Sequence, residues 1–151
     1  MNARSFLKVL EARYAVTRKT IAAIPADKLD FRPMPDMMSA RDLALHLVGN
    51  YTFLQAGLAQ GRWATDSFNI AGDFATTDAI VAKLDGVQAE SRAQLPAVPD
   101  GAFEARVQPF GIEQRVASLV QGIADHEIQH RGQLQVYLRL MGVTPPSAYG
   151  E

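Results

Sequence analysis

Apolar side chains recur every three or four residues along several stretches of the chain, which is the spacing of one face of an α-helix. The first stretch runs from Ser5 to Ile24 and stops at Pro25, because proline cannot continue the interior of a helix. The second begins near Ser39, a favourable residue for capping a helix N-terminus, and stops at Gly61. The pattern therefore predicts two long helices before the middle of the chain.

Two further amphipathic stretches follow. The third predicted helix begins at Thr76 or Thr77 and ends before Pro96. The fourth runs from Ile112 to Met141, where a glycine and then two prolines end it. Between these helices, residues 103–109 alternate weakly between apolar and polar, but one short extended run cannot make a sheet.

Two connectors are longer than a tight turn between neighbouring helices would need. Residues 26–38 contain Pro33 and Pro35, and residues 62–75 form a long loop with several aromatic side chains. Four amphipathic helices in a chain of 151 residues predict one all-α domain, a four-helix bundle over residues 1–151. The long connectors leave room for a crossover, so a simple up-down-up-down order does not follow.

Composition narrows the class of protein. Hydrophobic residues make up 48% of the chain, charged residues 21%, and the net charge is −1. Without a basic surface the chain lacks what nucleic-acid binding requires, and it has no apolar stretch of about 20 residues to span a membrane. The N-terminal pattern has charges among its apolar positions, unlike a signal peptide, so a cytoplasmic location is expected.

The chain contains no cysteine, which excludes disulfides, thiolate metal ligands and a cysteine nucleophile. Its three histidines all fall on the predicted inner faces of helices. His46 lies on the second helix, and His126 and His130 lie four residues apart on the fourth. Taken alone, each histidine is most simply interpreted as a hydrogen-bonded residue of the core. Three together favour a shared transition-metal ion, which satisfies one nitrogen of each ring.

Residues 126–130 also fit His-Glu-x-x-His, the helix motif of zinc proteases. The longer metzincin motif has a glycine and another histidine where this chain has Gln133 and Val136. A metalloprotease is therefore disfavoured.

Several polar residues near these histidines are candidates for catalysis. Asn50 and Gln133 could orient a bound water or a substrate, with ordinary hydrogen bonding between helices as the alternative. Asp42 lies one turn before His46 and could act as a base. Alternatively, its negative charge could simply stabilise the N-terminus of the helix. Arg131 could bind an anionic group, although pairing with Glu127 is the preferred interpretation.

The run HEIQHRGQL at residues 126–134 resembles the terminal motif of the DinB/YfiT-like family, and residues 29–35 and 39–53 resemble its first connector and second helix. The resemblance implies an up-down-down-up bundle that forms a homodimer. It also implies one divalent metal, nickel or zinc before iron or copper, held at the positions of His46, His126 and His130.

Some members of this family are S-transferases that use a low-molecular-weight thiol. The resemblance therefore implies a metal-dependent thiol S-transferase acting on a small electrophile, and the absence of cysteine suits a thiol brought by a small-molecule substrate. A metal-dependent hydrolase, and a non-catalytic metal-binding protein connected with stress, are the alternatives. An accessible pocket beside the histidines would favour an enzyme.

Overall fold

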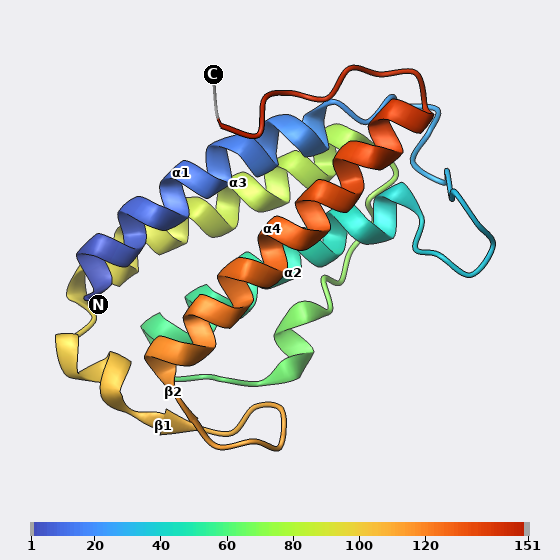
Figure 1. The fold of residues 1–151 in the computed structure, drawn as a ribbon. Helices are drawn as coiled ribbons and strands as arrows, with labels where there is room; N and C mark the ends of the chain where they lie inside the picture. The colour runs from blue at the N-terminus through green and yellow to red at the C-terminus, as the bar shows by residue number, and fades with distance from the viewer. Residues whose placement is uncertain (1, 150–151) are drawn as a thin grey trace.

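The computed structural model describes residues 2–149, and within them nearly all regular structure is helical. Four long helices pack side by side along the molecule (Figure 1). They are α1 (Ala3–Ala22), α2 (Ala40–Gln60), α3 (Thr77–Gln94) and α4 (Val116–Leu140). The predicted all-α four-helix bundle is therefore confirmed. None of the helices in the described part of the chain is both long and apolar enough to cross a membrane.

The chain order of the helices differs from their order in space. Helix α1 packs against α3 and α4, and α2 also packs against α3 and α4, so α1 and α2 lie diagonally across the bundle. In Figure 1, α1 and α4 run in one direction and α2 and α3 in the other, which is the up-down-down-up arrangement. The segment between α2 and α3 carries the chain back along the bundle and contains a short 3-10 helix (Thr65–Phe68).

Local capping determines where three of the helices begin. Asn2 and Ser5 exchange side-chain and backbone hydrogen bonds, so α1 begins at Ala3, two residues before the predicted start. Ser39 and Thr76 accept hydrogen bonds at the starts of α2 and α3, as the sequence predicts. Helix α2 ends at Gly61, which has a φ of +68°, a conformation that favours glycine.

The predicted start of the last helix is wrong. Helix α4 begins at Val116, because the preceding residues belong to a small antiparallel hairpin that pairs β1 (Arg106–Val107) with β2 (Gln114–Arg115). The turn contains Gly111 at a φ of +78°, and Ile112 is 71% exposed. Ile112 is apolar at helical spacing, but it faces solvent. Two further 3-10 turns, Leu95–Ala97 and Asp100–Glu104, connect α3 to this hairpin.

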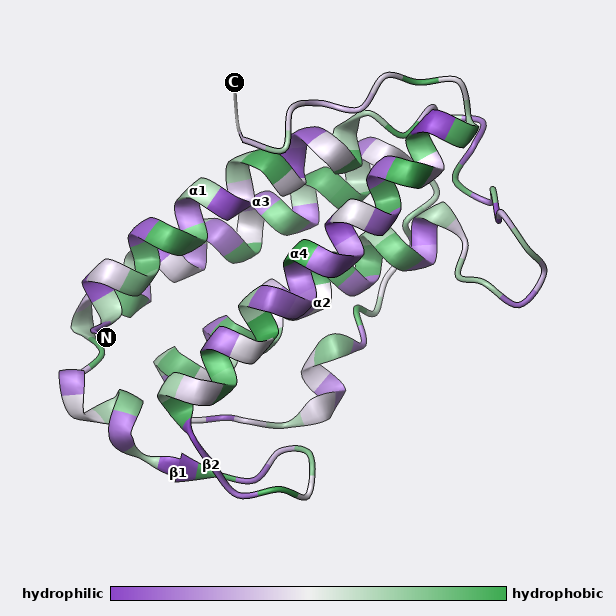
Figure 2. Cartoon of the chain, in the orientation of Figure 1, coloured by the Kyte–Doolittle hydropathy of each residue, from purple (hydrophilic) through white to green (hydrophobic). Residues whose placement is uncertain are grey.

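The core lies between the four helices, whose inward sides are mostly hydrophobic (Figure 2). Its largest fully buried side chains come from every long helix and include Ile21, Phe53, Leu84 and Tyr137. A cluster of buried polar groups lies where α1 and α2 face α4, and Glu127 is only 3% exposed there. His126 and His130 lie on another side of the same stretch of α4, facing His46 of α2.

Candidate metal centre

The three histidines converge between α2 and α4. The Nε2 atoms of His46 and His126 are 2.8 Å apart, and one ligating nitrogen from each of the three rings lies within 4.8 Å of the others. The ring of His130 lies edge-on to both neighbours, with its centroid 4.3 Å from that of His126 and 4.7 Å from that of His46. All three residues are half-buried. The grouping expected from the sequence is therefore present.

Burial keeps the rings of His46 and His126 in the uncharged form that binds metals. Burial, with a smaller contribution from the neighbouring imidazoles of His130 and His126, lowers the pKa of His46 to about 4. Burial and His130 also lower the pKa of His126. At neutral pH these two imidazoles are uncharged and carry a free nitrogen lone pair, which is the state that a transition metal requires. Three imidazoles at this spacing fit a divalent transition metal.

Gln133 orients one of the candidate ligands. Its Oε1 lies 3.0 Å from Nδ1 of His130, and a proton on Nδ1 that is donated to Gln133 leaves Nε2 free for a metal. The Gln133 amide in turn donates to the Tyr137 hydroxyl, which donates to the backbone carbonyl of Met38. The sequence predicts Gln133 as a group that orients water or substrate, and its catalytic role stays a prediction. Its contacts are those of a residue that positions His130.

Asn50 lies apart from the histidines. It is fully buried, and neither its Oδ1 nor its Nδ2 has a hydrogen-bond partner among the described residues. It lines a small internal cavity of about 10 Å³, together with Tyr51 and Glu127. A catalytic role for Asn50 stays a prediction. Its side chain faces this cavity between α1, α2 and α4.

Glu127 and Arg131 form the pair that the sequence favours. Their nearest charged atoms are 3.6 Å apart, and both side chains are at least 90% buried. Glu127 also accepts a hydrogen bond from the Thr17 hydroxyl of α1, and burial raises the pKa of its carboxyl group. Because Glu127 is engaged on the α1 side of α4, it does not supply the base of a zinc-protease motif. This geometry agrees with the rejection of a protease.

Asp42 is exposed at the start of α2. Arg32 donates a hydrogen bond of 3.3 Å to its carboxylate, and a second guanidinium nitrogen of Arg32 donates to the carbonyl of Met37. The Asp42 backbone N–H donates to the Ser39 side chain, so Asp42 lies in the first turn of α2. Its position is compatible both with a base and with a charge that stabilises the helix N-terminus. Its role as a base stays a prediction.

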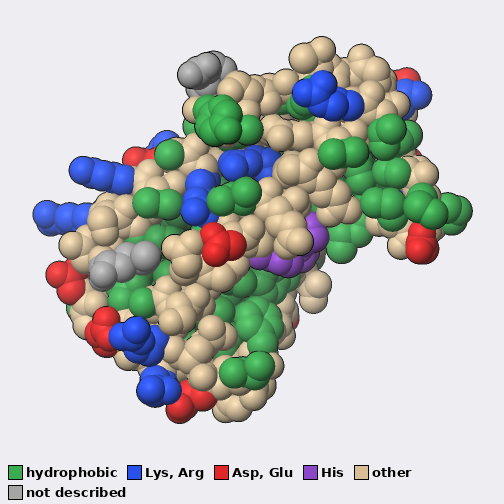
Figure 3. Space-filling model, viewed as in Figure 1, with side chains coloured by type: hydrophobic (Ala, Val, Ile, Leu, Met, Phe, Trp, Pro, Cys, Tyr) green, Lys and Arg blue, Asp and Glu red, His purple; other side chains and the backbone are tan. Residues whose placement is uncertain are grey.

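Two hollows of about 340 Å³ each open beside His46. The first, which we call the apolar hollow, is lined by His46, Phe68, Phe110, Gly122, Ile123 and His126. The second, the polar hollow, is lined by Met38, Asp42, Leu45, His46, Phe68, Asn69, Ile70 and Ala71. In Figure 3 the histidines reach the surface next to hydrophobic side chains. The candidate metal centre is therefore accessible from solvent.

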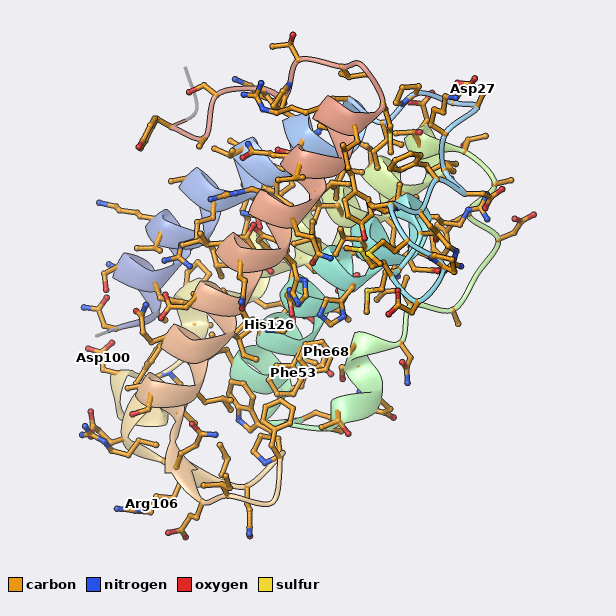
Figure 4. All side chains as sticks on the ribbon, turned by 45° about the vertical axis from the view of Figure 1, so that its right-hand side comes forward. Asp27, Phe53, Phe68, Asp100, Arg106 and His126 are labelled. Carbon is orange, nitrogen blue, oxygen red and sulfur yellow. The ribbon has the colours of Figure 1, made fainter. Side chains whose placement is uncertain are left out.

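Phe68 and Phe110 are the residues of this site that the sequence does not reveal as functional. Both lie outside the long helices, so no helical spacing connects them with the histidines. Figure 4 shows Phe68 and Phe53 on the same side of the bundle as His126. By contrast, Trp63 packs on Phe53 and against Gly57, and Tyr137 is buried, so both belong to the core.

Comparison with known proteins agrees with this fold. A model of the DinB family matches residues 1–151. The chain belongs to the DinB family. The crystal structure of the DinB-like protein YjoA from Bacillus subtilis is similar, with 21% sequence identity, a TM-score of 0.78 and coverage of 96% of each chain. A DinB-like protein from Bacillus cereus is 18% identical, with a TM-score of 0.79 and 97% of each chain covered.

At these identities the two solved DinB-like structures support the fold alone. No protein with a curated description matches the chain. What this DinB family member does therefore has to be argued from its own histidines and the two hollows beside them.

Proposed function

We propose that His46, His126 and His130 bind one divalent transition metal, nickel or zinc before iron or copper, and that the protein is a metal-dependent thiol S-transferase. The observation that carries the proposal is that three half-buried imidazoles converge beside two open hollows. A sealed site would suit a purely structural ion, whereas an accessible one leaves coordination positions for a small molecule.

A divalent cation held by His46, His126 and His130 would lower the pKa of a thiol that binds beside it. In the transfer step, the sulfur lone pair attacks an electrophilic carbon and forms a carbon–sulfur bond. The bond from that carbon to its leaving group breaks, the leaving group departs with the bonding electrons, and the thiol proton passes to solvent. Because the chain has no cysteine, the thiol comes from a second small molecule. The two hollows beside His46 offer room for both reactants.

The alternative of a metal-dependent hydrolase needs a base that activates water. Of the residues that line the two hollows, Asp42 is the one carboxylate, and it already accepts a hydrogen bond from Arg32. Glu127 faces α1. The geometry therefore favours thiol transfer over hydrolysis.

Metal content tests the first half of the proposal. Purified protein is loaded with Ni²⁺ or Zn²⁺, freed of excess metal and measured by elemental analysis. We expect about one equivalent in the wild type and a large loss in His130→Ala, because three ligands become two. Gln129→Ala, an exposed neighbour on α4, is the matched control and keeps its metal. Equal metal in all three proteins would refute the site.

Turnover tests the second half. Metal-loaded protein is mixed with iodoacetamide, a small electrophile, with and without cysteine as the free thiol. We expect protein-dependent consumption of iodoacetamide that requires cysteine and disappears in His46→Ala. Protein-dependent hydrolysis of a simple ester without thiol would instead support the hydrolase. A metal-loaded protein inactive in both assays would favour the non-catalytic alternative.

A further inference from the structure

We propose that the apolar hollow binds the hydrocarbon part of the electrophile, and that an aromatic ring is its best occupant. This inference rests on the proposed function, because it assigns a substrate class to the same metal centre. The observation behind it is the difference between the two hollows: only the polar one contains a carboxylate and an amide side chain.

The lining of the apolar hollow suits a group without charge. Its polar side chains are the two candidate ligands His46 and His126, and the other side chains are two phenylalanines and an isoleucine. A charged or strongly polar substituent would lose its hydration here without gaining a partner. A hydrocarbon group has little hydration to lose. With that group in the hollow, the reactive end of the electrophile would lie beside the two imidazoles.

One wall of the apolar hollow is held firmly by stacked rings. Phe68 stacks on the fully buried Phe53 with centroids 4.6 Å apart and an angle of 20° between the ring planes. Phe68 also stacks on His46, with 6.1 Å between the ring centroids and an angle of 19° between the ring planes. The backbone of Phe68 also lies directly against Gly49 of α2. A flat, rigid wall of this kind is complementary to another ring.

An exposed aromatic residue extends this wall. Phe110 lies in the loop of the β1–β2 hairpin and is 47% exposed, with its ring 6.2 Å from that of Phe68 and 5.7 Å from that of Phe53. An apolar ligand in the hollow would cover part of Phe110, which gains further burial. The position of Phe110 therefore favours an apolar occupant.

The volume of the apolar hollow limits the size of that occupant. A closed cavity of about 150 Å³ is enough for benzene, so a hollow of 340 Å³ accommodates a substituted ring. Gly122 of α4 gives a direct way to fill it, because a Cβ at this position would meet nothing within 4 Å. Gly122→Leu should therefore fold and occupy the hollow. Gly86→Leu on α3, where the space is equally open, is the control.

Binding is tested first, with benzyl alcohol as the probe and amide NMR shifts of the metal-loaded protein as the readout. We expect shifts at Phe68, Phe110 and Ile123, and roughly tenfold weaker binding in Gly122→Leu but not in Gly86→Leu. Shifts centred elsewhere, or equal binding by the two variants, would overturn the proposal. This measurement does not depend on turnover, so it stands apart from the transferase assay.

Turnover with two electrophiles then separates the two proposals. With cysteine as the thiol, Gly122→Leu should lower the ratio of kcat/KM for benzyl bromide to kcat/KM for iodoacetamide by roughly tenfold, whereas Gly86→Leu should leave this ratio unchanged. If thiol transfer occurs but the two electrophiles respond equally, the apolar subsite is wrong and the transferase stands. If benzyl alcohol binds in the hollow but neither electrophile is consumed, the subsite stands and the transferase is wrong.

Discussion

Gly49 is the residue on which the wall of the candidate site depends most directly. It lies in the middle of α2, and a Cβ at this position would be 2.5 Å from the carbonyl oxygen of Phe68. No side chain can rotate away to relieve such a contact, because the clash is with backbone. The 3-10 turn that contains Phe68 can therefore pack against α2 only where α2 carries a glycine.

We expect Gly49→Ala to destabilise the protein by about 1–3 kcal/mol, the usual result of overpacking. Gly86→Ala is the matched control, since it is also a helical glycine but has open space around it, and it should stabilise the fold by up to about 1 kcal/mol. Urea unfolding of the three proteins measures both effects. A Gly49→Ala variant as stable as Gly86→Ala would show that the Phe68 segment does not rest on α2 as described.

What the sequence reveals at this scale depends on whether a residue's role is local. His46, His126 and His130 could be predicted because helical spacing alone places them on inner faces. The contact of Gln133 with His130 is also local, three residues along α4, although the sequence predicts Gln133 to orient water or substrate and not His130. The role of Gly49 could not be predicted, because it depends on how a distant loop packs.

At the scale of elements, a charged cluster joins α1 to α3. Asp85 of α3 accepts two hydrogen bonds from the Arg18 guanidinium, at 2.8 and 3.0 Å, and one from the Tyr14 hydroxyl. The Arg18 guanidinium holds the pKa of Asp85 below its ordinary value, and the Tyr14 hydroxyl acts in the same direction. Because these helices are not consecutive in the chain, this cluster helps to fix the order of the bundle.

We expect Asp85→Asn to lower the free energy of unfolding by about 0.5–1 kcal/mol at pH 7. The value is small because the side chains of Arg18 and Asp85 are 44% and 38% exposed and solvent screens the pair. The folded pKa is depressed, so the contribution is complete above the ordinary aspartate value of about 3.9 and is lost as the pH falls through the folded value. Thermal unfolding of wild type and Asp85→Asn at pH 7 and pH 3 measures this contribution to stability.

The difference between wild type and Asp85→Asn should therefore shrink towards zero at acid pH. Glu90→Gln, an exposed carboxylate on the same helix, is the control and should differ little from wild type at either pH. A difference that stays constant from pH 7 to pH 3 would mean that the charge of Asp85 does not contribute to stability.

The long helices were predictable from the sequence because their periodicity and caps are local signals. The start of α4 was not, since Ile112 continues the apolar spacing of the helix. What places it in a hairpin is the pairing of Gln114–Arg115 with Arg106–Val107, a contact between segments that propensity does not specify. The structure adds a turn that brings Phe110 to the candidate site.

At the scale of the whole molecule, the histidines connect helices that the chain keeps far apart. His46 and His126 are 80 residues apart in sequence, and α2 and α4 run in opposite directions on one side of the bundle. The order of the helices follows from the DinB-like resemblance and is present in the structure, whereas periodicity alone left it open. The homodimer and the cytoplasmic location stay predictions.

A metal bound by all three histidines would hold α2 against α4, so it should stabilise the entire bundle. A ligand that binds only the folded state at 100 times its Kd adds about 2.7 kcal/mol, which corresponds to a rise in Tm of roughly 5–10 °C for a chain of this size. We expect this rise in wild type and Gln129→Ala on addition of Ni²⁺ or Zn²⁺, and its reversal by a chelator. His126→Ala should lose most of the rise. The same rise in His126→Ala would place the stabilising metal elsewhere.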